Sequence, residues 1–151
     1  MKIAEALIVR SDMQKKLAAL KQRVGNNVIV QEGDAPHEDP GALIAQSFAV
    51  QDALESLVVR INEANQSHLL ADGRKLSQAV AQRETLMARH ALISHAVAST
   101  NKEPDRYSMK EIKWVAVIKV AALQKQADDL AQAIREINIA IQETNWKAEL
   151  A

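Results

Sequence analysis

The residue types that most often carry chemistry are sparse in this chain of 151 residues. It has no cysteine, which excludes thiolate catalysis, disulfides and cysteine-ligated zinc. His90 and His95 are five positions apart, whereas two imidazoles on one helix share a metal ion when they stand at i and i+4. No Glu-x-x-His motif accompanies them, and helical carboxylate-bridged metal sites use such motifs. The sequence therefore predicts no metal site.

Motifs for nucleophilic catalysis and phosphate binding are missing as well. Serines such as Ser47 and Ser94 fall within amphipathic runs, without the strand and sharp turn that expose a catalytic serine. The four glycines are scattered, so no glycine-rich loop can cradle a phosphate. We therefore predict a protein that is not an enzyme and that has no catalytic residue and no cofactor.

Aromatic and basic residues come together at one place in the sequence, where Tyr107 and Trp114 are interleaved with Arg106 and Lys113. Bases stack on aromatic rings while cations hold phosphates, so this pattern is typical of single-stranded nucleic-acid binding. Lys15 on a basic first helix would extend such a surface. Nucleic acid remains the less favoured partner, because 19 Lys and Arg balance 19 Asp and Glu over the whole chain.

Long amphipathic helices must position these residues. Apolar side chains recur at alternating steps of three and four in four segments, which we predict to be helices over residues 2–24, 40–66, 74–98 and 120–146. The first seam consists of Ala6, Met13, Leu17, Leu20 and Val24, and the second of Leu43, Ser47, Val50, Leu54, Leu57, Ile61 and Ala64. The third consists of Leu76, Ala79, Arg83, Leu86, His90, Ile93 and Val97, and the last of Val120, Leu123, Ala127, Leu130, Ile134, Ile137 and Ile141. No helix of this length buries its stripe alone, so the sequence predicts an all-α bundle of four long antiparallel helices with coiled-coil-like seams.

The predicted helix boundaries rest on cap and turn residues. Gly25 is expected to end the first helix as its C-terminal cap. Asp39 stands before Pro40, the arrangement of an N-cap followed by proline at the first helical position. Asp72 and Gly73 mark the turn between the second and third helices.

Two short segments rich in β-branched residues interrupt the helical pattern. Residues 27–31 have the sequence NVIVQ, and residues 112–118 have the sequence IKWVAVI, whose β-branched residues and spacing we interpret as the period of two of a strand. We interpret both as strands that pair in a small two-stranded β ribbon covered by the bundle. The alternative for the second segment is a helix that starts at Ser108, because Ser108 and Glu111 have the spacing of a capping box.

Two seam positions of the third helix are polar, namely Arg83 and His90. With Glu84 they could build a polar site in the centre of a bundle. The favoured interpretation is that they are interface or edge residues, whose stems pack while their polar heads reach water or a partner carboxylate.

The length fits a single helical domain over residues 1–151. Residues 1–24 carry six basic and two acidic side chains, whereas residues 25–40 carry four acidic ones. We expect the acidic loop to neutralise the basic helix, although a solvated helix face gives the same pattern. The N-terminus lacks the features of a signal peptide, and no run of 18 apolar residues occurs, so we expect a cytoplasmic protein and do not expect a membrane partner.

Several short stretches resemble a family of small uncharacterised bacterial proteins, some of which carry the label septicolysin. The stretches are Val30-Gln31-Glu32-Gly33, Glu38-Asp39-Pro40, Arg60-Ile61-Asn62, Asp72-Gly73-Arg74, Arg106-Tyr107-Ser108, Glu111 to Val115, Val120 to Gln126 and Asn145-Trp146. The resemblance runs nearly end to end and implies a helical fold without known catalytic residues. The label implies a membrane-damaging activity. This chain has Lys119 where an acidic cap is expected before the last helix.

Apolar residues also occur outside the seams. They include Ile8, Val9, Ile44, Phe48, Val58, Val59 and Ile139. A surplus of this kind usually marks protein contacts, so we predict a homo-oligomer, most simply a two-fold dimer with Phe48, Arg83, His90 and Ile139 as candidate interface residues. The predicted function is a non-enzymatic interaction or assembly role, with membrane activity and nucleic-acid binding as alternatives.

Overall fold

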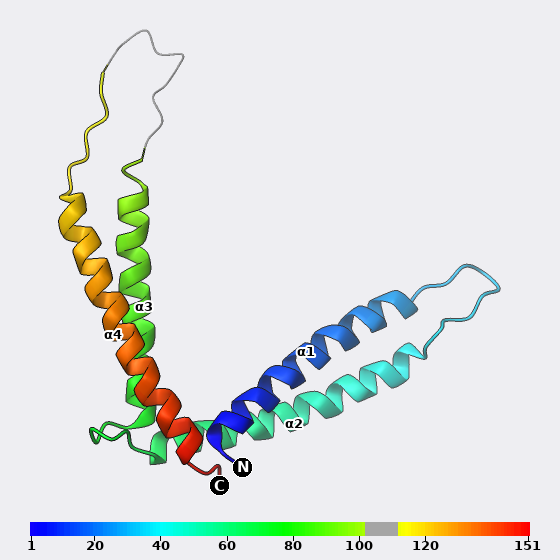
Figure 1. Cartoon of the computed structure of the whole chain (residues 1–151). Coiled ribbons are helices and arrows are strands. Elements are labelled where there is room, and N and C mark those ends of the chain that lie inside the picture. Colours follow the sequence, from blue (N-terminus) through cyan, green and yellow to red (C-terminus); the bar gives the residue numbers. More distant parts are fainter. Residues whose placement is uncertain (102–111) are drawn as a thin grey trace. The chain divides into compact units, whose positions relative to one another are not determined.

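The computed structural model describes residues 1–101 and 112–151 and contains four long helices (Figure 1). They are α1 (Ile3–Asn27), α2 (Pro40–Ser67), α3 (Leu76–Ala98) and α4 (Val120–Lys147). The predicted all-α class is confirmed. Helices α2 and α4 start at the predicted residues and each continue one residue further than predicted.

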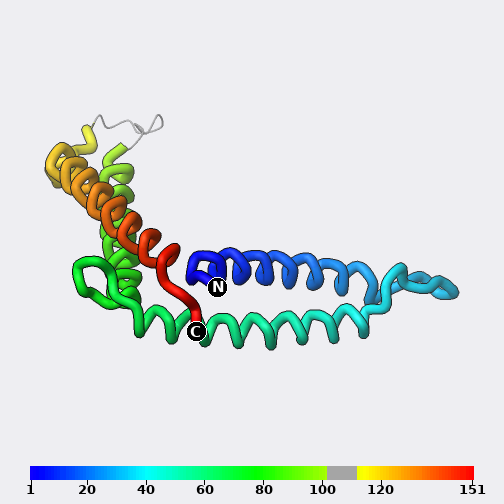
Figure 2. Tube along the Cα trace, turned by 60° about the horizontal axis from the view of Figure 1, so that its bottom comes forward, coloured from blue at the N-terminus to red at the C-terminus, as the bar shows by residue number. Residues whose placement is uncertain are grey.

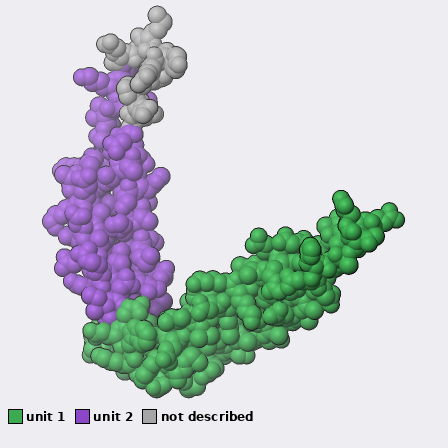
Figure 3. Space-filling view, turned by 45° about the vertical axis from the view of Figure 1, so that its right-hand side comes forward, with its two compact units in different colours: residues 1–76, 142–151 green, residues 77–141 purple. Residues whose placement is uncertain are grey.

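The chain divides into two compact units (Figure 3). Unit 1 contains residues 1–76 and 142–151, and therefore α1, α2 and the last residues of α4. Unit 2 contains residues 77–141, which form almost all of α3 and most of α4.

In unit 1, α1 and α2 form an antiparallel hairpin whose helices lie side by side (Figures 1 and 2). The predicted seam residues of both helices are buried or half-buried. Leu20 of α1 is 1% exposed and Ile61 of α2 is 2% exposed. Burying an aliphatic side chain of this size contributes about 1.5–3 kcal/mol, so the facing seams hold the two helices together.

The predicted end of α1 at Gly25 is wrong, because the helix continues through Gly25 to Asn27. Asn27 is 7% exposed, and its amide nitrogen Nδ2 donates a hydrogen bond to the carbonyl of Arg23. Its Oδ1 accepts one from the backbone amide of Glu38 at 3.0 Å. A tertiary contact with the loop therefore extends the helix by two residues beyond the glycine.

Helix α2 begins as its sequence predicts. The Asp39 side chain accepts a hydrogen bond from the amide of Gly41 at 3.0 Å, and Pro40 occupies the first helical position. Proline suits this position because its missing N–H has no partner to lose there. The acidic loop before α2 also meets the basic helix as expected, since Glu38 forms an ion pair with Arg23.

The predicted β ribbon is wrong. Neither residues 28–31 nor residues 112–118 form a strand, and Asn27 belongs to α1. The two segments lie in different units, and both are exposed, with Val117 as much as 98% exposed. An isolated pair of strands is stable only when another layer covers one face, and that layer is missing for these exposed segments. The alternative start at Ser108 lies outside the described residues.

Helix α3 begins at Leu76, two residues after the predicted start at residue 74. Gly73 has a positive φ of 85°, which glycine adopts at little cost and other residues rarely adopt. The amide of Arg74 donates to the Asp72 side chain at 3.0 Å. Residues 74 and 75 therefore belong to the turn, and α3 starts directly after them.

The residues at the two chain ends meet in unit 1. Lys2 and Glu149 form an isolated antiparallel bridge, in which Ile3 N donates to Ala148 O and Leu150 N donates to Met1 O. Lys2 Nζ lies 2.6 Å from Glu149 Oε1. We call residues 1–3 and 148–150 the terminal clamp.

In unit 2, α3 and α4 lie side by side, and their seam residues are again buried or half-buried. Burial is uneven along the pair. Ala79, Ile137 and Ile141 are buried, whereas Ile93 and Leu130 in the other half are half-buried.

Candidate interaction surfaces

One face of the α1–α2 hairpin carries a shallow groove of about 370 Å³. We call it the front face. Its groove is lined by Leu17, Ala18, Lys21 and Val24 of α1 and by Ile44, Ser47, Phe48 and Gln51 of α2. The front face therefore joins apolar side chains from both helices around a hollow.

Phe48 is the largest apolar side chain on this face and is 60% exposed. Ile44 lies one turn before it and is also exposed. Both stand beside the seam that faces α1, so α2 has a second apolar stripe next to the first. A wide apolar stripe is typical of a helix that packs against more than one neighbour. The structure thus places Phe48 at the surface, as the interface prediction requires.

The two helices of the hairpin have opposite charge. Helix α1 contains five basic and two acidic residues, and α2 contains one basic and three acidic residues. At the tip of the hairpin, Arg23 Nε donates to Glu38 Oε2 at 2.9 Å. This hydrogen bond to the guanidinium lowers the pKa of the Glu38 carboxyl and raises the pKa of Arg23.

Arg83 has its polar partners within unit 2. Its guanidinium donates to Glu84 Oε1 at 2.9 Å, and Nη1 lies 3.5 Å from Asn138 Oδ1 on α4. The side chain is half-buried, as is His90 two turns later on the same seam. Both side chains are therefore only partly covered, and the carboxylate beside Arg83 comes from the neighbouring residue. Their role at an interface stays a prediction.

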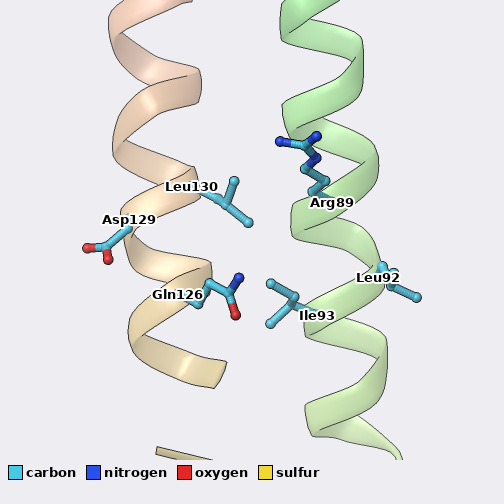
Figure 4. A pocket seen from close by; sticks show the side chains of 6 residues that line it. All are labelled: Arg89, Leu92, Ile93, Gln126, Asp129 and Leu130. Carbon is cyan, nitrogen blue, oxygen red and sulfur yellow. The ribbon is translucent and has the colours of Figure 1, made fainter. Parts of the chain in front are cut away.

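Unit 2 has a second hollow between α3 and α4, of about 460 Å³. It is lined by Arg89, Leu92, Ile93, Gln126, Asp129 and Leu130. Ile93, Gln126 and Leu130 point into the space between the helices, whereas Asp129 and Leu92 point away from it (Figure 4). Asp129 instead accepts a hydrogen bond from Lys125 at 2.9 Å.

Ile139 is exposed on α4, in the other unit from Phe48. The two predicted interface residues are therefore exposed on different units.

The residues predicted to bind nucleic acid are also divided between the units. Lys15 lies on α1 in unit 1 and is 3.7 Å from Asp12, whereas Lys113 and Trp114 lie exposed in unit 2. Arg106 and Tyr107 lie outside the described residues. The described residues of this set do not form a continuous surface within either unit.

Two features bear on other classes of site. Within residues 1–101 and 112–151, no group of three or more His, Cys, Asp or Glu residues is arranged to hold a metal ion. Helix α2 is long and apolar enough to cross a membrane, and 11% of its most apolar window is buried. Core helices of water-soluble proteins pass the same test of length and composition.

Comparison with known proteins gives a structural relative and a family. No curated protein matches the chain. The chain is similar to a crystal structure described as a functionally unknown conserved protein from Corynebacterium diphtheriae, with 33% sequence identity, a TM-score of 0.90, and coverage of 100% of this chain and 99% of that one. A family of unknown function (DUF6847) matches residues 10–150. The chain therefore belongs to this family of unknown function, DUF6847.

Proposed function

We propose that the protein has a non-enzymatic assembly role and that its α1–α2 hairpin associates with a second copy to form a homodimer. The observation that carries the proposal is the second apolar stripe of α2, in which Ile44 and Phe48 are exposed beside a buried seam. In a hairpin of two helices, each helix covers only one side of the other and leaves the remaining sides exposed to solvent. The exposed stripe is the kind of surface that protein contacts cover.

Two such hairpins would together make a four-helix bundle. In a bundle each helix contacts two neighbours, which requires two adjacent apolar stripes on each helix. Helix α2 has both stripes, one with Leu57 and Ile61 against α1 and one with Phe48 on the front face. The opposite charges of α1 and α2 favour a second copy as the partner, because a two-fold pair can place each basic helix next to an acidic one.

Size-exclusion chromatography with light scattering tests the dimer. At tens of micromolar we expect about twice the 16.6 kDa of one chain. Phe48→Lys places a charge on the apolar stripe and should give a folded monomer, whereas Ala49→Lys, at an exposed position on the other side of α2, should remain dimeric. A monomeric mass for the unmodified protein would disprove the proposal.

A second candidate function is action on membranes. It is favoured by the composition of α2, which has the length of a membrane span and a small buried share. The septicolysin label of the resembling proteins points the same way. Dye release from liposomes at micromolar protein would support this function, and intact liposomes would favour the assembly role.

A further inference from the structure

The front face has a different character on its two sides. On α1 the exposed residues that line the groove are Ala18 and Lys21, beside the half-buried Leu17 and Val24. On α2 the exposed lining residues are larger on average, with Ile44, Phe48 and Gln51 beside the half-buried Ser47. The α1 side of the front face therefore has room for the large side chains that project from the α2 side. A surface whose two sides fit each other in this way can pair with a second copy of itself.

A face-to-face dimer of antiparallel hairpins has two possible two-fold axes. An axis across the helices puts α1 on α1 and α2 on α2, so that two basic helices meet and two bulky stripes meet. An axis along the helices puts α2 of each copy over α1 of the other. The lengthwise axis pairs opposite charge and pairs large with small side chains, and both effects favour it.

The lengthwise axis also fixes the register. Ala18 and Phe48 line the same groove and therefore stand at a similar level along the hairpin. A two-fold axis along the helices preserves this level, so Phe48 of one copy lies over Ala18 of the other. Lys15 lies one turn before Ala18 and Asp52 one turn after Phe48, and in antiparallel helices both steps lead away from the tip. Lys15 and Asp52 therefore face each other across the rim.

We infer that the protein dimerises through the front face of its α1–α2 hairpin about a lengthwise two-fold axis, with Phe48 packed on the second copy's Ala18 and Lys15 paired with its Asp52. The inference rests on the proposed dimer and adds the surface, the orientation and the register. It also gives Lys15 a role other than contact with nucleic acid.

The chain has no cysteine, so single-cysteine variants report the arrangement directly. Lys15→Cys and Asp52→Cys proteins are mixed, allowed to exchange subunits and oxidised mildly. Disulfides form only between Cα atoms about 4.4–6.8 Å apart. With the lengthwise axis, cross-linking appears in the mixture and reaches about half of the chains, which is the statistical share of mixed pairs. Each variant alone should stay uncross-linked.

The alternatives give different patterns. A crosswise axis that passes through the middle of α1, where Lys15 lies, predicts that Lys15→Cys cross-links with itself, whereas the lengthwise axis keeps the two Lys15 residues on opposite rims. Lys16→Cys, at an exposed neighbouring position on the opposite side of α1, is the matched control and should not cross-link with Asp52→Cys. A dimeric mass without the mixed cross-link, or with self-linked Lys15→Cys, overturns this geometry but leaves the dimer. A monomeric mass for the unmodified protein overturns the dimer itself.

Discussion

The two helical pairs of this protein differ in the contacts that hold their ends together. The α1–α2 hairpin is tied at its tip by Asn27 and the Arg23–Glu38 ion pair, and unit 1 is also tied by the terminal clamp. The described part of the α3–α4 pair has a buried end near Ala79 and a half-buried end near Ile93. Seams with the same spacing are therefore buried to different extents in the two pairs. We attribute the difference to the contacts at the ends of each pair, which the spacing of apolar residues does not encode.

The largest expected effect compares equivalent leucines of the two pairs. Leu20→Ala in α1 removes a side chain that is 1% exposed and should lower the free energy of unfolding by about 2–5 kcal/mol. Leu130→Ala in α4 removes a half-buried side chain and should cost clearly less. Urea unfolding followed by circular dichroism measures both. Equal losses would show that the two pairs are equally well packed.

Asn27→Ala tests the fastening at the tip. The change leaves the half-buried amide of Glu38 and the carbonyl of Arg23 without the Asn27 side chain as hydrogen-bond partner, which should cost about 1 kcal/mol. Asn26→Ala is the control, because Asn26 is exposed on the same turn. Amide hydrogen exchange should show faster opening of the last turn of α1 in Asn27→Ala. Unchanged exchange there would mean that the helix end does not depend on the loop.

These differences also show which features the sequence predicts. The seams were predictable, since each helix repeats its own pattern and α2, for example, buries Leu43, Leu57 and Ile61 as expected. Opposite charge in neighbouring segments likewise predicted that the acidic loop meets the basic helix, and the ion pair of Glu38 with Arg23 makes that contact. Local periodicity therefore located the helices and their inward faces.

Features that depend on distant contacts were not predictable. Residues 28–31 and 112–118 have the composition of strands but no covering layer, and composition alone does not report that lack. The terminal clamp joins Lys2 to Glu149, and single residues so far apart leave no periodic signal. Arg10 occupies a half-buried position on α1, where its Nε is buried without a hydrogen-bond partner. Of the candidate interface, exposure at Phe48 was predictable, whereas its division from Ile139 was not.

Glycine substitutions should have smaller effects, of opposite sign at the two positions. Gly25 lies within α1, and an added Cβ would meet no atom within 4 Å, so Gly25→Ala should stabilise unit 1 by about 0.5–1 kcal/mol. Gly73 has a φ of 85°, so Gly73→Ala should destabilise the turn before α3. Thermal unfolding of both variants gives the signs. A loss of stability in Gly25→Ala would indicate that the helix end needs the freedom of glycine.

The smallest effect concerns the terminal clamp and is seen as a change with pH. The Glu149 carboxyl accepts hydrogen bonds from Lys2 and from the N-terminal amine, and these lower its pKa from the ordinary value of 4.5. A group with a lowered folded pKa stabilises the fold above its unfolded pKa, and this contribution is lost as the pH falls through the folded value. Glu149→Gln should therefore be less stable than the unmodified protein near neutral pH, and the stabilities of the two proteins should become equal as the pH falls below about 4.5.

The ion pair of Lys2 with Glu149 is exposed, so the difference in stability should be small and should shrink in high salt. Thermal unfolding at a series of pH values measures it, with Glu143→Gln, an exposed carboxylate on α4, as the control. A gap between Glu149→Gln and the unmodified protein that stays constant down to acidic pH would mean that the clamp depends on its backbone bridge and not on this charge.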